Sequence, residues 1–224
     1  VCKVLDSGYI GQGPKVDEFE KQIGDYFGNK KVITTNAGTS ALHLALHLLK
    51  KPKPHWNEDV FQGVAFVSHN WPGIEDGDEV LATPLTCTAS NWPIVANNLK
   101  IKWVDIDPTT LNMDLEDLER KMTPKTKAIM GVHWGGYPLD LDEIRNIRAR
   151  FRKEHGWAPA LIEDGAHSIG TKYKGKYLGN HGNFVMNSLQ AIKHITSVDG
   201  GLLYCPHDEL YERAKLLRWY GIDR

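Results

Sequence analysis

The sequence predicts an α/β protein with a seven-stranded, mostly parallel sheet and helices on both faces. Short β-rich runs alternate with helical runs along most of the 224 residues, and this alternation is typical of parallel sheets covered by helices. Hydrophobic residues make up 41% of the chain, which is enough for one substantial core. We therefore expect residues 1–224 to form one large domain.

The strands are expected where β-branched and other apolar residues cluster in short runs. These runs are Lys31–Thr35, Glu79–Thr83, Ile101–Asp105, Ala128–Val132, Ala160–Glu163, Asn183–Asn187 and Gly201–Tyr204.

Helices are expected between several of the strands. Ala41–Leu49 combines strong helix formers with no breaker. The start of the chain resembles the last turns of a helix that stops at Gly8, and its end resembles a helix reaching a glycine cap at Gly221. We therefore expect a fragment truncated at both ends. The other helical runs are Val16–Phe27, Leu115–Met122, Leu141–His155 and Asp208–Tyr220.

The segment from Lys50 to Asp76 breaks the alternation and is too long for an ordinary connection. We expect an insertion over residues 50–76. Its aromatic residues either pin a surface excursion to the body or help to cover a site or a partner. The prolines and aromatics include Pro52, Pro54, Pro72, Trp56, Phe61 and Trp71.

The composition argues against several classes of partner. The net charge is −1 with mixed signs, which favours neither a nucleic-acid partner nor an anionic membrane. No apolar run approaches the ~18 residues of a spanning helix, and no signal peptide is visible at the start. Cys2, Cys87 and Cys205 are odd in number and far apart, as expected for reduced thiols in a cytoplasmic protein.

A carboxylate and an amine in separate motifs indicate the chemistry. Asp164 lies at a probable strand end, where α/β proteins place their sites, and Lys193 follows 29 residues later. A pyridine aldehyde cofactor needs an amine for a Schiff base and a carboxylate to hold its ring nitrogen protonated. A phosphate on that cofactor needs hydroxyls and backbone N–H groups as well. The sequence supplies these groups in order between Gly38 and Lys193.

The phosphate donors are expected in the motif Gly38-Thr39-Ser40, which follows a strand and opens a helix. A helix N-terminus presents free N–H groups and the positive end of a dipole. The alternative is an ordinary N-cap, since Thr and Ser are favoured there. Ser188, five residues before Lys193, adds a second candidate hydroxyl.

Each of the two principal residues also has an ordinary interpretation. Asp164 could be a cap or an ion-pair partner, and Lys193 could be a solvated surface lysine. The small residues after Asp164 suit a flat ring against the backbone, and His167 could contact the phenolic oxygen of that ring. Lys193 has no acidic residue within five positions, and apolar surroundings would favour its neutral amine.

The combined motifs resemble the DegT/DnrJ/EryC1/StrS aminotransferases, which are pyridoxal 5′-phosphate (PLP) enzymes of fold type I that aminate nucleotide-linked keto-sugars. The resemblance runs from Gly8 to Gly221. The matching stretches are Gly38-Thr-Ser-Ala-Leu42, Gly77-Asp-Glu-Val80, Pro84-Leu-Thr-Cys-Thr-Ala89, Glu163-Asp-Gly-Ala-His167 and Ser188 with Lys193-His-Ile-Thr196.

The resemblance implies roles for individual residues. Lys193 would form the Schiff base and move the proton, and Asp164 would pair with the pyridine nitrogen. Thr39, Ser188 and the backbone at Gly38 would hold phosphate. His167 occupies the place of a Gln or His that reaches the phenolic oxygen. The resemblance also implies a homodimer in which each chain completes the site of the other.

The chain departs from the family pattern at several points. Cys87 stands where many relatives carry an aromatic residue that stacks on the ring, so a neighbour such as a tryptophan of Lys50–Asp76 would supply the stacking. Asp199 replaces a frequent Glu before Gly-Gly. The family continues past Gly221 into a smaller C-terminal domain, so we expect the fold type I large domain without that small domain.

Competing interpretations are weaker. Gly8-Tyr-Ile-Gly-Gln-Gly13 lacks the dinucleotide-binding spacing and a preceding strand. His43 and His47 share a helix face but have no evident third ligand, so no metal is expected. Cys87 could be a nucleophile as in a desulfurase, but those enzymes carry their reactive cysteine on a different loop.

Two interpretations stay closer to the family. One is a related PLP-dependent sugar dehydratase, which carries His in place of the lysine. The other is a PLP-binding fragment without turnover. Because Lys193 is present, we expect an aminotransferase that moves an amino group from an amino acid, with glutamate as the expected donor, to a nucleotide-linked keto-sugar. Surface-polysaccharide or amino-sugar biosynthesis is the expected setting.

Overall fold

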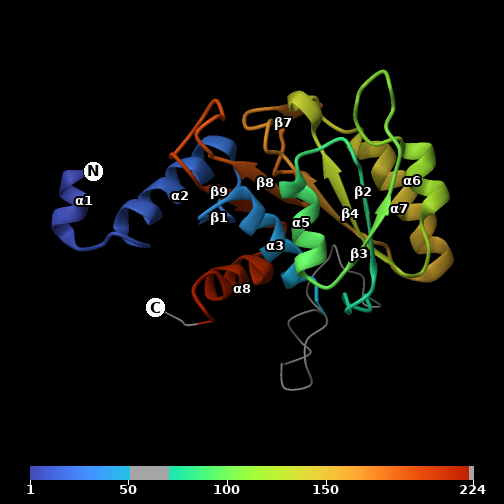
Figure 1. Ribbon diagram of the computed structural model, residues 1–224, viewed down its shortest axis with the longest axis horizontal. Coiled ribbons are helices and arrows are strands. Elements are labelled where there is room, and N and C mark those ends of the chain that lie inside the picture. The colour runs from blue at the N-terminus through green and yellow to red at the C-terminus, as the bar shows by residue number, and fades with distance from the viewer. Residues whose placement is uncertain (51–70, 222–224) are drawn as a thin grey trace.

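A seven-stranded sheet forms the centre of the computed structural model, which describes residues 1–50 and 71–221 (Figure 1). The strand order is β1-β9-β8-β5-β4-β2-β3, and only β9 runs antiparallel to its neighbours. The predicted mostly parallel sheet is therefore confirmed, and the strand ends differ from the expected positions by at most two residues. The bounds are β1 Val32–Thr35, β2 Glu79–Ala82, β3 Lys100–Trp103, β4 Thr126–Val132, β5 Ala160–Asp164, β8 Phe184–Ser188 and β9 Gly201–Tyr204.

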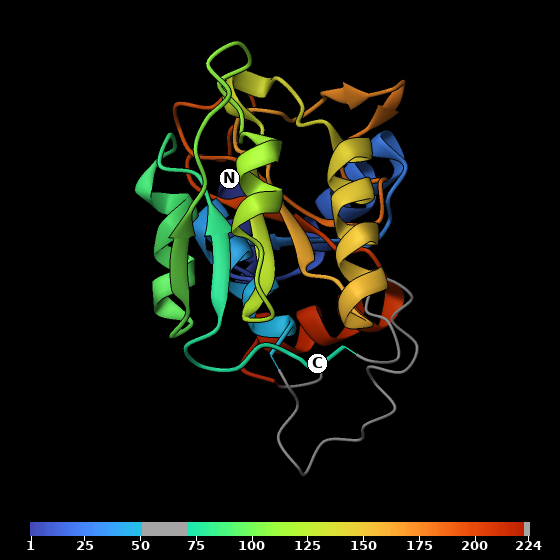
Figure 2. The same cartoon turned by 90° about the vertical axis from the view of Figure 1, so that its right-hand side faces the viewer.

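Helices cover both faces of the sheet, as expected. In Figures 1 and 2, α3 and α5 lie on one side and α6 and α7 on the other. The bounds of the helices are α1 Cys2–Ser7, α2 Pro14–Phe27, α3 Gly38–Leu48, α5 Thr88–Ala96, α6 Leu115–Lys121, α7 Leu141–His155 and α8 Asp208–Arg218, with a 3-10 turn η1 at Trp134–Gly136.

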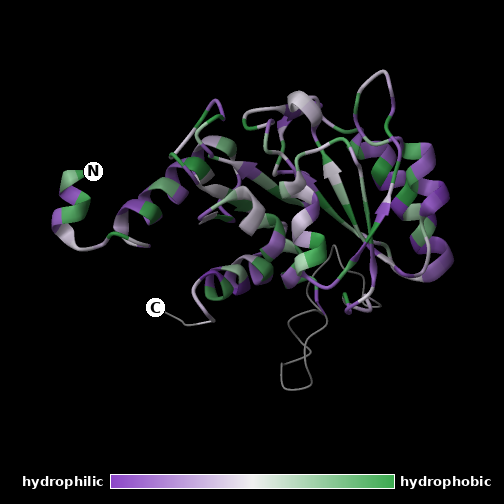
Figure 3. Cartoon of the chain, in the orientation of Figure 1, coloured by the Kyte–Doolittle hydropathy of each residue, from purple (hydrophilic) through white to green (hydrophobic). Residues whose placement is uncertain are grey.

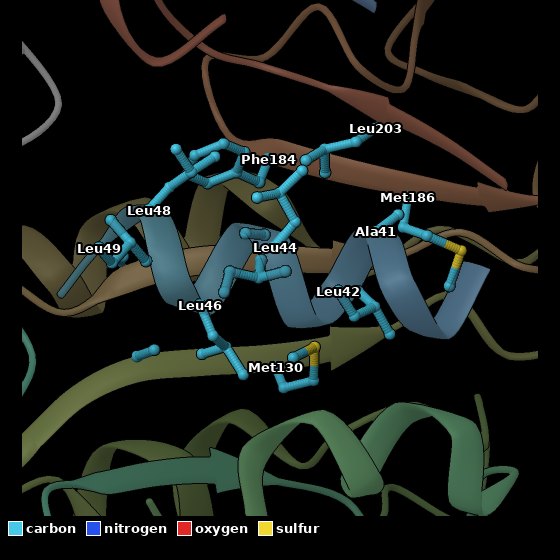
Figure 4. Packing of buried hydrophobic residues seen from close by; sticks show 14 of the residues in the cluster. Ala41, Leu42, Leu44, Leu46, Leu48, Leu49, Met130, Phe184, Met186 and Leu203 are labelled. Atoms are coloured by element: carbon cyan, nitrogen blue, oxygen red, sulfur yellow. The ribbon is translucent and has the colours of Figure 1, made fainter. Parts of the chain in front are cut away.

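Alternating strand residues build two cores. In β4, Ala128 and Met130 join the cluster under α3 and α8, whereas Ile129 joins the cluster under α6 and α7. Side chains of a strand point alternately to opposite faces, so one apolar strand supplies both cores. Figure 4 shows Leu46 of α3 beside Met130 and Leu48 beside Phe184. In Figure 3, α6 and α7 carry both hydrophobic and hydrophilic stretches, as amphipathic helices on a sheet should.

Helix ends follow local chemistry. Asp140 accepts hydrogen bonds from the N–H groups of Asp142 and Glu143 at the start of α7, and Gly156 ends that helix in the left-handed region. The last helix, expected to reach Tyr220, ends instead at Arg218, because the next residue leaves helical geometry. The N–H of Gly221 still donates to the carbonyl of Leu216, so the predicted glycine cap is confirmed.

Among the described residues, three elements were not expected from the sequence. They are α5, the turn η1, and a small hairpin of β6 Lys172–Tyr173 and β7 Lys176–Tyr177. At the other end, α1 ends at Gly8 as predicted and buries none of its residues. It extends away from the body of the molecule (Figure 1).

Most of the expected insertion, residues 51–70, lies outside the described residues. Its edges are tied down: Lys50 pairs with Asp76 at 2.9 Å, and the rings of Trp71 and Trp157 lie 5.5 Å apart. Among the residues that the structure describes, no helix is both long and apolar enough to cross a membrane.

Candidate active site

The carboxyl-terminal edge of the sheet brings the sequence-predicted residues together. Asp164 ends β5, Ser188 ends β8, and the first turn of α3 follows β1. The loop 189–200, which carries Lys193, joins β8 to β9 at the same edge. Because β1, β9, β8 and β5 are consecutive neighbours in the sheet, residues far apart in sequence meet there.

Asp164 is held by several hydrogen bonds and is only 4% exposed. Its Oδ1 accepts from the N–H of Ala166 at 2.9 Å, and its Oδ2 accepts from the hydroxyl of Ser90 at 2.5 Å. Its backbone carbonyl accepts from the N–H of His133 at 3.0 Å. In the described part of the chain no cation forms an ion pair with this carboxylate, so the ion-pair interpretation fits poorly, whereas the bond from Ala166 shows that Asp164 also caps the turn that follows β5.

Ser90 was not identified from the sequence. It lies in α5 and is 1% exposed, and its hydroxyl is 2.6 Å from that of Thr86. The motif Pro84–Ala89 had marked this neighbourhood, but nothing in the sequence links it to a carboxylate 74 positions away.

The glycine after Asp164 is required by close packing. A Cβ on Gly165 would lie 2.6 Å from Oγ of Ser168 and 2.7 Å from both Nδ2 of Asn187 and the carbonyl oxygen of Met186. Because β8 and Ser168 fill the space that a Cβ would occupy, no larger residue fits at this position.

His167 stands within electrostatic reach of both principal groups. Burial lowers its pKa most, the charge of Lys193 lowers it further, and Asp164 opposes both effects. The imidazole is therefore neutral at neutral pH and can donate or accept a hydrogen bond. Its ring lies edge-on to that of Trp134 at 5.9 Å, a neighbour that the sequence did not suggest.

The first turn of α3 presents uncapped N–H groups. Its N-cap is Ala37, which makes no side-chain cap, and the first intrahelical bond runs from Ala41 to Ala37. A Cβ on Gly38 would lie 3.3 Å from Cβ of Ser188 and 2.8 Å from Sδ of Met186, so this turn abuts the end of β8. Thr39 is half-buried in the same turn.

Ser40 takes a different position from the other phosphate candidates. It lines a large cavity beside α3, together with His43, His47 and the glycine-rich segment before α2. His43 lies 3.3 Å from the side-chain amide of Asn97. In residues 1–50 and 71–221 no group of three potential metal ligands occurs.

Lys193 is half-buried in the loop between β8 and β9. Hydrogen bonds between Leu189 and Gly200 (2.9 Å) and from Ser197 to Leu189 (3.0 Å) close that loop at its base. Its amine has no hydrogen bond or ion pair with any described residue. The neighbouring Ile192 and Val198 are apolar, but they are 83% and 79% exposed.

Cys87 is exposed and forms the N-cap of α5, one turn before Ser90. The expected stacking by a tryptophan of the 50–76 segment near Cys87 involves residues that lie largely outside the described ranges. Gly8 and Gly13, from the rejected dinucleotide-loop motif, separate α1 from α2: Gly8 is the left-handed C-cap and Gly13 the N-cap.

Together these groups fit a phosphorylated pyridine aldehyde. The uncapped turn of α3 and the Ser188 hydroxyl suit a phosphate. A buried carboxylate suits a protonated ring nitrogen, and an amine without a partner suits an aldehyde.

Comparisons with known proteins give the same family as the sequence motifs. The model of the DegT/DnrJ/EryC1/StrS aminotransferase family matches residues 1–55 and 63–224. Among solved structures, AtS13 from Actinomadura melliaura is 51% identical with a TM-score of 0.87, and the chain covers 54% of it. The sugar aminotransferase CalS13 from Micromonospora echinospora is 43% identical with a TM-score of 0.86, and the chain covers 55% of it. Each alignment includes 100% of this chain.

A curated relative is the spore coat polysaccharide biosynthesis protein SpsC of Bacillus subtilis (strain 168). It is 33% identical over 224 residues, which are 100% of this chain and 50% of SpsC. The chain therefore spans about half the length of the relatives it matches.

Proposed function

The chain belongs to the DegT/DnrJ/EryC1/StrS aminotransferase family, and on this premise we propose that it forms the cofactor-binding large domain of a PLP-dependent sugar aminotransferase. The observation that carries the proposal is the meeting of Asp164, Lys193 and the uncapped first turn of α3 at one sheet edge. The name of CalS13, a sugar aminotransferase, supports a sugar as the substrate.

The phosphate would be held where α3 begins. The N–H groups of Gly38, Thr39 and Ser40 lack intrahelical partners, and the hydroxyls of Thr39 and Ser188 flank that turn. The helix dipole adds to the attraction of the N–H groups for an anion.

Asp164 would hold a proton at the ring nitrogen. Its burial and its fixed hydrogen bonds keep the carboxylate in one orientation, so it can stabilise a positive charge at a defined place. When bound, PLP supplies an electron sink that allows an amino group to leave one carbon and join another.

Lys193 would anchor the cofactor through its amine and then carry the proton of the reaction. Its Nζ takes a proton from the α-carbon of the donor and returns one on the other side of the transfer. His167, being neutral, can donate a hydrogen bond to the phenolic oxygen without adding charge near Lys193. Cys87 would face the ring at the start of α5.

The proposed donor is an amino acid, with glutamate first, and the proposed acceptor is a nucleotide-linked keto-sugar. The name of SpsC supports polysaccharide biosynthesis as the setting. A homodimer is also proposed, because apolar residues around the site stand exposed in this chain: Ile10 is 76% exposed and Ile192 is 83% exposed. A partner chain would cover such a surface.

The test is the first half of the reaction. PLP-loaded protein is mixed with glutamate, and 2-oxoglutarate is measured with the absorbance change of the cofactor. Stoichiometric 2-oxoglutarate followed by amination of a nucleotide-linked keto-sugar supports the proposal. Loss of a sugar hydroxyl without amination would indicate a dehydratase, and bound PLP without either product would indicate a binding fragment.

A further inference from the structure

The hydroxyls of Thr86 and Ser90 form a chain that ends on the candidate cofactor carboxylate. Oγ1 of Thr86 is 2.6 Å from Oγ of Ser90, and Oγ of Ser90 is 2.5 Å from Oδ2 of Asp164. Ser90 and Asp164 are 1% and 4% exposed, so water does not compete for the bond between them, and Thr86 is half-buried.

The donor and acceptor capacities of these groups determine which group donates each of the two hydrogen bonds. An ionised carboxylate only accepts hydrogen bonds, so the single hydroxyl proton of Ser90 points to Asp164. The oxygen of Ser90 can then only accept from Thr86, and Thr86 must donate. Each hydrogen bond polarises the next one, which strengthens the bond to the carboxylate.

The backbone keeps the two hydroxyls in place. Ser90 lies in the first turn of α5, and its N–H donates to the carbonyl of Cys87 at 3.0 Å. Thr86 precedes the N-cap Cys87, and its hydroxyl reaches that of Ser90 at 2.6 Å. The opposite oxygen of Asp164 is fixed by the N–H of Ala166 at 2.9 Å. The carboxylate is therefore held from two sides.

We propose that Ser90, supported by Thr86, is a positioning residue that keeps the carboxylate of Asp164 aimed at the ring nitrogen of the cofactor. This inference rests on the proposed function. Ser90 acts through Asp164: its hydroxyl holds Oδ2 in one orientation, and a hydrogen bond to a charged carboxylate is stronger than one between neutral groups.

The test compares the binding of two ligands: PLP, and the 1-deaza analogue of PLP, in which carbon replaces the ring nitrogen. Binding is measured by quenching of tryptophan fluorescence. Ser90→Ala should weaken PLP binding by about ten-fold or more, because a hydrogen bond to a charged group is lost. Binding of the deaza analogue should be nearly unchanged, since it offers Asp164 no ring N–H.

Two further variants complete the design. Thr86→Val keeps Ser90 and should reduce PLP binding in the same direction but less. Ser168→Ala is the matched control, because Ser168, in the loop after β5, is also buried (2% exposed) but donates to the carbonyl of Gly165 at 3.3 Å. It should leave the ratio of the two affinities at the wild-type value.

Equal losses for both ligands in Ser90→Ala would show a merely structural role and overturn the inference, as would no loss for either. Wild-type protein that binds neither ligand would instead overturn the proposed function itself.

Discussion

Nε2 of His133 lies 2.9 Å from a carboxylate oxygen of Glu163, and both side chains are fully buried. The N–H of Leu139 donates to Nδ1 of His133, so the ring proton must sit on Nε2 and point to Glu163. The other oxygen of Glu163 accepts from Asn183 at 2.7 Å. These hydrogen bonds connect residues that flank β4 and β8 to Glu163 in β5. Asp164 follows Glu163 in the same strand, so its side chain points to the opposite face of the sheet.

Replacing Glu163 with Gln should destabilise the fold. The amide of Gln has one acceptor oxygen, whereas His133 and Asn183 both donate to this position, so one donor would face an N–H group. We expect the free energy of unfolding to fall by about 1–3 kcal/mol. Urea unfolding followed by circular dichroism measures the change.

The control for that variant is Glu154→Gln, since Glu154 is 76% exposed and its one ion pair among the described residues is with His155, at 3.7 Å. Its free energy of unfolding should stay near the wild-type value. Equal urea midpoints for Glu163→Gln and wild type would show that the buried network does not contribute to stability.

The strands that position the site could be predicted because each is a short, mostly apolar run rich in β-forming residues. Asp164 was found because it ends such a run. The helix α5 could not be found in this way, since Pro93 inside it argues against a helix. It forms nevertheless because Pro93 and Ile94 are buried, and the side-chain amide of Asn97 donates to the carbonyl of Pro93 at 2.9 Å at the end of the helix.

Replacing Gly201 with Ala should disturb the start of α3. A Cβ there would lie 2.6 Å from the backbone of Ala37 and from the N of Gly38, and backbone atoms cannot move aside cheaply. We expect a loss of about 1–3 kcal/mol of stability from overpacking. Phosphate affinity should fall as well, because the N–H groups of the α3 turn shift.

Differential scanning calorimetry with and without inorganic phosphate measures both effects of Gly201→Ala. The matched control is Gly11→Ala, since a Cβ on Gly11 would meet nothing within 4 Å. If the two variants have the same melting temperature and are stabilised equally by phosphate, the close approach of β9 to α3 does not constrain the residue at position 201.

The small hairpin of β6 and β7 is a second element that could not be predicted from the sequence. Its strands have two residues each, too short for an alternating pattern to register. The turn depends on two consecutive residues with positive φ, Lys174 at 47° and Gly175 at 80°. Gly175 was the one local signal, and the lysine beside it gives no warning of that conformation.

Acid should destabilise the protein through its half-buried histidines. Burial is the main cause that lowers the pKa of His43 and of His47 from 6.5. The unfolded chain therefore binds protons more readily than the native one, so stability is present above pH 6.5 and is lost as the pH falls. The melting temperature should drop between about pH 7.5 and 5.5.

The double variant His43→Gln with His47→Gln should reduce that dependence but not abolish it, because burial also lowers the pKa of His167 and of His207. The carboxylates with lowered pKa, such as Asp117 and Glu119, lose their contribution only below their ordinary values of 3.8 and 4.5, outside this window. An unchanged pH slope in the double variant would mean that other groups cause the acid loss.

The attachment of PLP to Lys193 is best tested by borohydride reduction of the PLP-loaded chain, followed by peptide mapping with mass spectrometry. We expect one reduced adduct, on Lys193, that is absent from Lys193→Ala and retained in the exposed-lysine control Lys153→Ala. An adduct that persists in Lys193→Ala, or adducts spread over surface lysines, would contradict the assignment of Lys193 as the cofactor-binding residue.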